Sequence, residues 1–191
     1  MFSSEPRNGD DPAFTVRYTS TAIVLHWLIA FVVISQIVLG WLMQEIPKVP
    51  VGPRVNAYNL HKSIGLTVLM LMALRLAWRA THAPPPPVAM PAWQVRAAWV
   101  SHWLLYACLF VQPLSGYLGS AFSGYPVRYF GLVLPAWAAT SPTLKQVFEN
   151  VHLVTSVVLV AAIALHVAAA FKHHLIDRDG LLYRMRWRRA R

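Results

Sequence analysis

The sequence predicts an all-α integral membrane protein built as a bundle of four helices. Of its 191 residues, 57% are hydrophobic and only 13% are charged, a balance too apolar for an ordinary soluble domain. The apolar residues are also gathered into long blocks. Four of these blocks are near the ~20 residues that a helix needs to cross a hydrocarbon core of ~30 Å. A single four-helix unit therefore accounts for nearly the whole chain.

The first predicted span covers residues 21–43 and follows a polar segment, residues 1–20. Because this span is long and lacks an evident small-residue cleavage site, we interpret it as a retained helix rather than a signal peptide. The proline-rich residues 44–58 then predict a short external connection. It leads to the second span, residues 59–78, which opens at His61.

The third predicted span, residues 98–122, follows a linker of residues 81–94 whose consecutive prolines cannot form a helix. Pro113 lies near the middle of this span, where a proline frees a carbonyl and usually kinks the helix. The next stretch, residues 124–145, is aromatic and contains proline. We expect it to be an interfacial loop with one short helix, lying over the outer face.

The fourth predicted span covers residues 151–171 and leads into a basic tail. The chain thus divides into the polar segment 1–20, a membrane domain of residues 21–175 and a cytoplasmic tail of residues 176–191. The single cysteine, Cys108, lies in the third span, so an intrachain disulfide is excluded. The sequence also lacks a C-x-x-C-H motif, so any haem must be held without thioether bonds.

The basic residues predict how the chain sits in the membrane. The net charge is +10, but the cations are distributed by side rather than gathered in a nucleic-acid-binding motif, so we expect no nucleic acid partner. Most of them lie at the N-terminus, in the loop between the second and third spans, and at the C-terminus. These regions share one face of a four-span protein, and the positive-inside rule makes that face cytoplasmic. Both termini are therefore expected inside, with the tail touching anionic membrane lipid.

Histidines within the spans are the main functional signal, because an ionisable side chain inside a bilayer is costly and is a functional hypothesis by default. Five of the eight histidines fall within or at the edges of the spans: His26, His61, His102, His152 and His166. His152 and His166 lie fourteen residues apart, which on an α-helix returns both imidazoles to nearly the same face, roughly 21 Å apart along the axis. This spacing indicates two metal centres near opposite sides of the membrane.

Depth in the membrane predicts how the histidines pair. His26, near the inner start of the first span, lies level with His166, while His61 and His152 both open their spans on the outer side. Iron in haem b with two axial imidazoles is six-coordinate, a state suited to electron transfer. Zinc is the competing interpretation, but two histidines without nearby Cys, Asp or Glu lack its usual third protein ligand. The residues favour two haems b, an inner one on His26 and His166 and an outer one on His61 and His152.

Several other residues suit the same sites but keep a second interpretation. Arg75 lies fourteen residues after His61 and returns to the ligand-bearing face at inner depth, where it would pair with a haem propionate or snorkel as a positive-inside residue. Gly65 lies one turn after His61 on the same face. Four glycines would let a flat ring approach closely, and would equally serve tight helix packing: Gly40, Gly65, Gly116 and Gly119.

Three more histidines have no assigned partner. His102, near the inner start of the third span, would be a spare ligand, a proton relay to a quinone or a propionate partner. His173 and His174 lie just beyond the fourth span. They would form a quinone site or sit among lipid headgroups, and interface placement is the favoured interpretation.

Taken together, several segments resemble the bacterial cytochrome b561 family. They are HW at His26, NLHKSIG and RLAWR at the two ends of the second span, the proline linker, SHWLLY opening the third span, and VH and LHVAAAFKHHLIDRDGLLYRM at the two ends of the fourth. The likeness covers about residues 17–186. It implies a four-helix protein with two haems b, multi-pass in the bacterial inner membrane. The haem-iron ligands would be His26, His61, His152 and His166, and ubiquinone would accept or donate the electrons.

The resemblance also implies an activity. A family member of similar length acts as a superoxide oxidase, so the concrete expectation is an enzyme, a superoxide:ubiquinone oxidoreductase. Outer basic residues would attract the superoxide anion: Lys62, Arg54, Arg128 and Lys145. Related subunits serve hydrogenases and formate dehydrogenases, so an electron-carrying subunit that docks a soluble redox partner is the alternative. A transport or structural protein whose histidines only relay protons is the alternative of another class.

Overall fold

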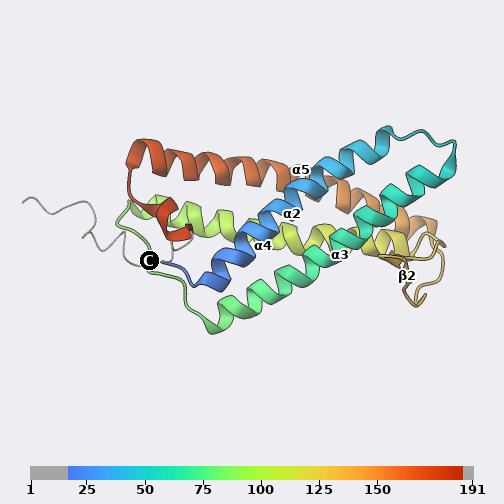
Figure 1. The fold of residues 1–191 in the computed structure, drawn as a ribbon, viewed down its shortest axis with the longest axis horizontal. Helices are drawn as coiled ribbons and strands as arrows, with labels where there is room; N and C mark the ends of the chain where they lie inside the picture. The colour runs from blue at the N-terminus through green and yellow to red at the C-terminus, as the bar shows by residue number, and fades with distance from the viewer. Residues whose placement is uncertain (1–16, 187–191) are drawn as a thin grey trace, which may run out of the picture.

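The computed structural model describes residues 17–186 and contains four long helices, each long and apolar enough to cross a membrane. In chain order they are α2 (Ser20–Glu45), α3 (Val51–Thr81), α4 (Ala92–Ala121) and α5 (Pro142–Lys172). Most of the polar N-terminal segment, residues 1–16, and the end of the basic tail, residues 187–191, lie outside the described residues. The described chain is therefore an all-helical multi-pass membrane protein with one small β-hairpin, as Figure 1 shows.

Each helix begins before the apolar block that predicted it. α3 starts at Val51, directly after Pro50, so residues 46–50 alone connect it to α2 and the expected loop of residues 44–58 is wrong. α5 starts at Pro142, whose missing amide costs nothing in a first helical turn. Its N-cap residue Ser141 accepts a hydrogen bond from the Leu144 amide at 3.3 Å. These polar first turns are helical because a helix satisfies its own backbone groups as it enters the membrane.

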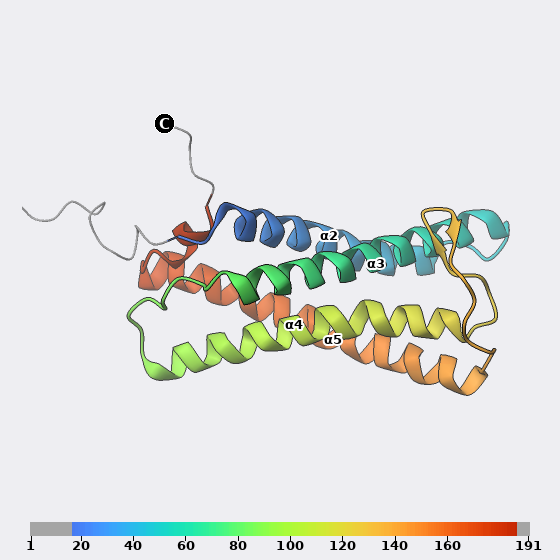
Figure 2. The same ribbon diagram turned by 90° about the horizontal axis from the view of Figure 1, so that it is seen from below.

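The helices are arranged in two layers. Figure 2 shows α2 and α3 in one layer, and α4 and α5 in the other. α2 packs on α3, α4 packs on α5, and contacts between α3 and α4 join the layers. Following the predicted topology, we call the end that holds residues 17–19 and the linker of residues 82–91 the inner end. The opposite end, with residues 46–50, is the outer end.

A seven-residue spacing sets three levels inside the bundle, because residues seven apart return to nearly the same face of a helix. These faces hold His26, Val33 and Gly40 on α2, His61, Val68 and Arg75 on α3, and His152, Leu159 and His166 on α5. The three aliphatic side chains at the middle positions are only 4–6% exposed and belong to one hydrophobic cluster with Met72 and Cys108. An apolar middle layer therefore separates an outer from an inner histidine level.

Outward-facing side chains are largely apolar. Phe31 is 72% exposed and Leu165 is 71% exposed, although both lie within helices long and apolar enough to span a membrane. Water would penalise such a surface, whereas lipid tails are as apolar as these side chains. The sides of the bundle therefore face lipid.

The segment between α4 and α5 forms a hairpin, not the short helix expected from the sequence. Strands β1 (Arg128–Tyr129) and β2 (Leu132–Val133) pair antiparallel around Phe130 and Gly131, both at positive φ, as a two-residue hairpin turn requires. The hydroxyl of Ser63 on α3 accepts the Phe130 amide at 2.9 Å, and Thr67 bonds the Tyr129 hydroxyl at 3.2 Å. The hairpin is therefore fastened to the outer end of α3.

The C-terminal segment closes the inner end. α5 passes into a π-helical turn, η1 (His173–Asp177), and a 3-10 turn, η2 (Leu181–Met185). The Trp27 indole donates to the Met185 carbonyl at 2.9 Å. The guanidinium of Arg184, which is 6% exposed, donates to the Pro86 carbonyl at 2.6 Å. These two hydrogen bonds connect the tail to α2 and to the proline linker at the inner end of the bundle.

Candidate functional site

Two pairs of histidines face each other across the bundle, one pair at each histidine level. On the inner level, the ring centres of His26 on α2 and His166 on α5 lie 6.3 Å apart. On the outer level, the ring centres of His61 on α3 and His152 on α5 are also 6.3 Å apart. Each partner comes from the opposite layer, so each pair spans the gap between the two helical hairpins.

The spacing within each pair suits one metal ion between two imidazoles. A metal–imidazole bond is about 2.0–2.1 Å long, and a ring with bonds near ~1.33 Å places its nitrogen about 1.1 Å from its centre. Two imidazoles that share one metal therefore have ring centres about 6 Å apart. Two stacked rings would lie closer together. A hydrogen bond between two imidazoles could account for one pair, but it would not account for a second pair with the same 6.3 Å spacing. The histidines thus fit a group whose metal takes two axial nitrogens.

Contacts around His152 fix which ring nitrogen carries the proton and which carries the lone pair. Nδ1 of His152 donates to the Gln112 carbonyl at 2.8 Å, while the Gln112 side-chain amide donates to Nε2 at 3.1 Å. Both bonds put the lone pair on Nε2, the tautomer that a metal needs. Gln112 precedes Pro113 within α4. A carbonyl oxygen has two lone pairs, so the Gln112 carbonyl accepts the imidazole proton as well as the Ser115 hydroxyl, which lies 3.0 Å from it.

Two glycines give the outer histidines their room. A Cβ at Gly116 would lie 3.0 Å from Cε1 and 3.1 Å from Nδ1 of His152, and a Cβ at Gly40 would lie 3.3 Å from Cε1 of His61. At Gly65 a Cβ would meet the Gln36 amide nitrogen at an ordinary 3.5 Å. Gly40 and Gly116 therefore admit the imidazole rings themselves, whereas Gly65 lies against Gln36.

Three buried polar atoms at the outer level have no hydrogen-bond partner among residues 17–186: Nδ1 of His61, Oε1 of Gln36 and Oε1 of Gln112. The Gln36 amide nitrogen does bond the His61 carbonyl at 2.7 Å. Buried polar atoms normally find partners, so three orphans gathered beside one histidine pair indicate a polar group between the layers. This observation, like the ring spacing, fits a bound prosthetic group.

A basic side chain, Arg75, lies beside the inner histidine pair. The Arg75 guanidinium donates to Nδ1 of His26 at 3.0 Å and to the Tyr106 hydroxyl at 3.3 Å. Because a guanidinium only donates, His26 carries its proton on Nε2 in this arrangement. Coordination through Nε2 then requires Arg75 to take another partner, which an acidic side group of the ligand would supply. His102, unpaired in the sequence analysis, lies with its ring centre 5.5 Å from that of His166.

The four outer basic residues differ in what they contact. Arg54 donates to the Gln44 and Ile46 carbonyls at 3.0 and 2.6 Å, so it caps the end of α2. Lys145 forms an ion pair with Glu149 at 3.2 Å. Lys62 is half-buried beside His61, and Arg128 is exposed on the hairpin. Lys62 and Arg128 are therefore better placed than Arg54 and Lys145 to attract an anion.

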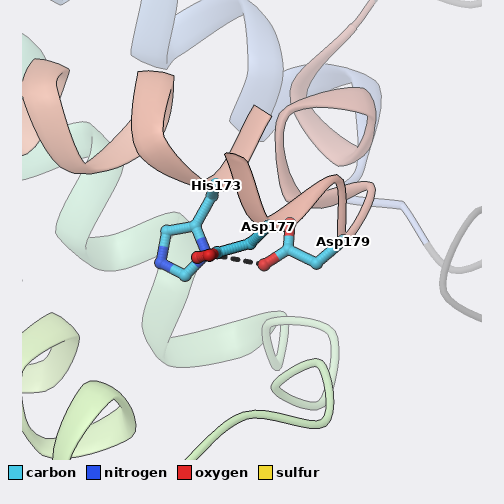
Figure 3. Close-up of side chains that lie close together, drawn as sticks. All are labelled: His173, Asp177 and Asp179. Carbon is cyan, nitrogen blue, oxygen red and sulfur yellow. Dashed lines mark hydrogen bonds and ion pairs between the residues drawn. The ribbon is translucent and has the colours of Figure 1, made fainter. Parts of the chain in front are cut away.

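The two adjacent histidines beyond α5 point to different partners. Nδ1 of His173 lies 2.6 Å from Oδ2 of Asp179 and 3.2 Å from Oδ2 of Asp177, as Figure 3 shows. His174 instead meets the Tyr183 ring edge-on, with centres 5.9 Å apart. The two aspartates, Gln36 and the hydrogen-bonding role of Gln112 were missed in the sequence. The signal for the glutamines was available, because an amide in an apolar span needs a partner as a histidine does.

Comparison with known proteins identifies relatives along nearly the whole chain. Residues 17–188 match the family model of prokaryotic cytochrome b561. Cytochrome b561 homolog 2 of Escherichia coli strain K12 is 34% identical over 171 residues, covering 88% of this chain and 90% of that protein. Homolog 1 of the same strain is 31% identical over 182 residues, covering 91% and 98%. The probable superoxide oxidase CybB of Yersinia pestis is 28% identical over 175 residues, covering 88% and 95%.

Proposed function

Because the chain belongs to the prokaryotic cytochrome b561 family of membrane electron-transfer proteins, which bind b-type haem, we propose that it carries single electrons across the membrane on two haems b. His26 and His166 hold the inner haem, and His61 and His152 hold the outer one. The supporting observation is the pair of histidine couples, each with ring centres 6.3 Å apart, on two levels of one bundle.

Haem b bound by two imidazoles supplies a reversible one-electron couple with no open position for an exogenous ligand. The chain's own residues supply the rest. Gln112 holds the proton of His152 on Nδ1, so the lone pair is on Nε2. The Gln112 amide that donates to Nε2 would have to give way to the iron. Arg75 and His102 lie beside the inner pair, and Arg75 would neutralise a propionate there. Val33, Val68 and Leu159 exclude water between the levels.

The most concrete form of this function is superoxide:ubiquinone oxidoreductase. The similarity to the Yersinia pestis protein supports it, as do the half-buried Lys62 beside His61 and the exposed Arg128. These cations would draw the superoxide anion to the outer end, in a salt-dependent way. Two superoxide ions become dioxygen, and one ubiquinone takes up two electrons and two protons. The inner-end histidines His102, His173 and His174 belong to the proposed quinone site.

The topology follows from the same proposal. The inner end holds basic residues near the start of α4 and in the tail, among them Arg96, Arg178 and Arg184, so it would face the cytoplasm of a bacterial inner membrane. The tail would then lie against anionic lipid. Reporter fusions at each terminus should both report a cytoplasmic location, and a periplasmic report from either would reverse the assignment of the two ends.

Spectroscopy on the purified protein tests the proposal. A pyridine haemochrome assay should give two haems b per chain, and His61→Ala or His152→Ala should lower that number to one while the inner site keeps its spectrum. A colourless protein, or one haem in the wild type, would contradict the two-site proposal. Ubiquinone reduction driven by superoxide tests the activity separately, because its failure would leave the electron relay intact.

A further inference from the structure

Gln36 on α2 contacts the histidine that opens the outer level on α3. Its side-chain amide nitrogen donates to the His61 carbonyl at 2.7 Å. α2 and α3 lie side by side in one layer, as Figure 2 shows. An amide inside an apolar span costs free energy unless it finds a polar partner. The amide of Gln36 is therefore fixed to one particular residue of the neighbouring helix.

This hydrogen bond also fixes the orientation of the Gln36 amide. Only the nitrogen of an amide can donate to a carbonyl, so Oε1 is the atom that is left over. Oε1 of Gln36 and Nδ1 of His61 are both buried, and neither has a hydrogen-bond partner among residues 17–186. Buried polar atoms in native proteins are normally paired. The two unpaired atoms thus belong to the two residues that the 2.7 Å bond already joins.

The unpaired edge of the His61 ring faces α2. A Cβ at Gly40 would lie 3.3 Å from Cε1 and 3.8 Å from Nδ1 of His61, so this edge borders the backbone of α2. Gln36 precedes Gly40 by four residues, about one helical turn, and shares its face of the helix. On α3, a Cβ at Gly65 would lie 3.5 Å from the Gln36 amide nitrogen. Gln36 therefore lies on the side of the ring that carries Nδ1.

Coordination of a metal would make the two unpaired atoms complementary. A metal takes the lone pair of one imidazole nitrogen and leaves the proton on the other. With Nε2 on the metal, Nδ1 of His61 becomes a donor, and such a donor almost always has an acceptor. His152 already has one, the Gln112 carbonyl at 2.8 Å. Oε1 of Gln36 can only accept a hydrogen bond, so it supplies what His61 lacks within residues 17–186.

We propose that Gln36 is a positioning residue of the outer site, whose Oε1 accepts the Nδ1 proton of His61 while its amide nitrogen keeps the bond to the His61 carbonyl. The inference rests on the two-haem function proposed above. An acceptor on Nδ1 raises the basicity of an axial imidazole, which favours ferric over ferrous iron. Gln36 therefore lowers the reduction potential of the outer haem and favours the passage of its electron to the inner one.

Redox titration of the purified full-length protein, followed by visible absorption, measures the midpoint potential of each haem. The outer haem is identified as the one missing from His152→Ala. Gln36→Leu keeps the size of the side chain and removes its polar atoms, and it should retain two haems. The ferric–ferrous equilibrium of the outer haem should shift about 10-fold towards ferrous iron, the lower range for loss of an outer-shell partner. This shift is about 59 mV upward for a one-electron couple, and the inner midpoint should not move.

Two further variants separate the acceptor from packing. Gln36→Glu keeps an accepting oxygen in either protonation state, so its outer midpoint should lie at or below the wild-type value. The matched control is Gln44→Leu, the same substitution on the same helix. The Gln44 amide donates to the Gly40 carbonyl of α2 itself at 3.1 Å, so both midpoints should keep their wild-type values in this variant.

Each outcome decides for or against the acceptor. An outer midpoint that stays at the wild-type value in Gln36→Leu, or that rises equally in Gln36→Glu and Gln36→Leu, would overturn the role of Oε1. Loss of the outer haem from Gln36→Leu but not from Gln36→Glu would support that role, and loss from both would overturn it. These results leave the two-haem function intact, whereas fewer than two haems in the wild type would overturn that function itself.

Discussion

Replacing Gly116 with alanine should weaken the outer haem site specifically. The new Cβ would lie 3.0 Å from Cε1 and 3.1 Å from Nδ1 of His152, whereas carbon contacts are optimal at about 3.5–4.0 Å. The ring must therefore retreat by about 0.5 Å or more, which stretches the 2.8 Å bond from Nδ1 to the Gln112 carbonyl. Overpacking costs about 1–3 kcal/mol, and a weakened hydrogen bond adds about 0.5–1.5 kcal/mol.

These costs sum to about 1.5–4.5 kcal/mol, which corresponds to roughly 10-fold to 1,000-fold weaker haem binding. Transfer of haem to an excess of a scavenging apoprotein measures this change, and the absorption spectrum reports which haem is lost. The matched control is Gly119→Ala, one turn along α4, where the Cβ meets nothing closer than 3.6 Å. Equal haem retention in the two variants, or loss of the inner haem first, would refute the reasoning from the ring contact.

Two more substitutions test other parts of the site. Arg75→Met removes the guanidinium that donates to His26 and would pair with a propionate, so the inner haem should dissociate about 10-fold to 100-fold more readily, given about 1.5–3 kcal/mol for a hydrogen bond to a charged group. Transfer of haem to a scavenging apoprotein measures this dissociation. The control is Arg79→Met, because the Arg79 guanidinium lies over the Tyr106 ring and, within residues 17–186, forms no hydrogen bond with His26. An inner haem that dissociates from Arg75→Met at the wild-type rate would contradict the role of Arg75 in holding it. Ser63→Ala deprives the Phe130 amide of its 2.9 Å acceptor, so the hairpin should exchange its amide hydrogens about 10-fold faster for a loss of roughly 1.4 kcal/mol. Hydrogen-exchange mass spectrometry checks this, and equal hairpin exchange in Ser63→Ala and in the α2 control Ser35→Ala would show that Ser63 does not fasten it.

The helical architecture was accessible from the sequence because membrane spans carry a strong signal. Backbone groups in lipid must bond internally, so an apolar block of sufficient length has to be a helix. The spacing of His152 and His166 then indicated two levels, because the helical repeat is fixed. The same periodicity brought Arg75 to the inner level, where it contacts His26.

Contacts between helices were not accessible in the same way. The bonds from Gln112 to His152 depend on how α4 and α5 pack, and no spacing within either helix encodes that packing. The early start of α3 was missed because its polar first turns lack the apolar signal, while helix formation there needs only local hydrogen bonds. The hairpin at Phe130 was missed because Phe is an unusual residue at positive φ, and its anchor, Ser63, lies sixty-seven residues away.

The apolar layer of Val33, Val68 and Leu159 also has an electrical consequence. Water and ions are excluded from it, so much of any voltage across the membrane falls between the two histidine levels. Those levels are about 21 Å apart in a core of about 30 Å, and moving one charge through the full field takes about 2.3 kcal/mol per 100 mV. An electron passing inward through the layer would therefore work against a negative cell interior by about 1.6 kcal/mol per 100 mV. A larger membrane potential would therefore slow the inward transfer of electrons.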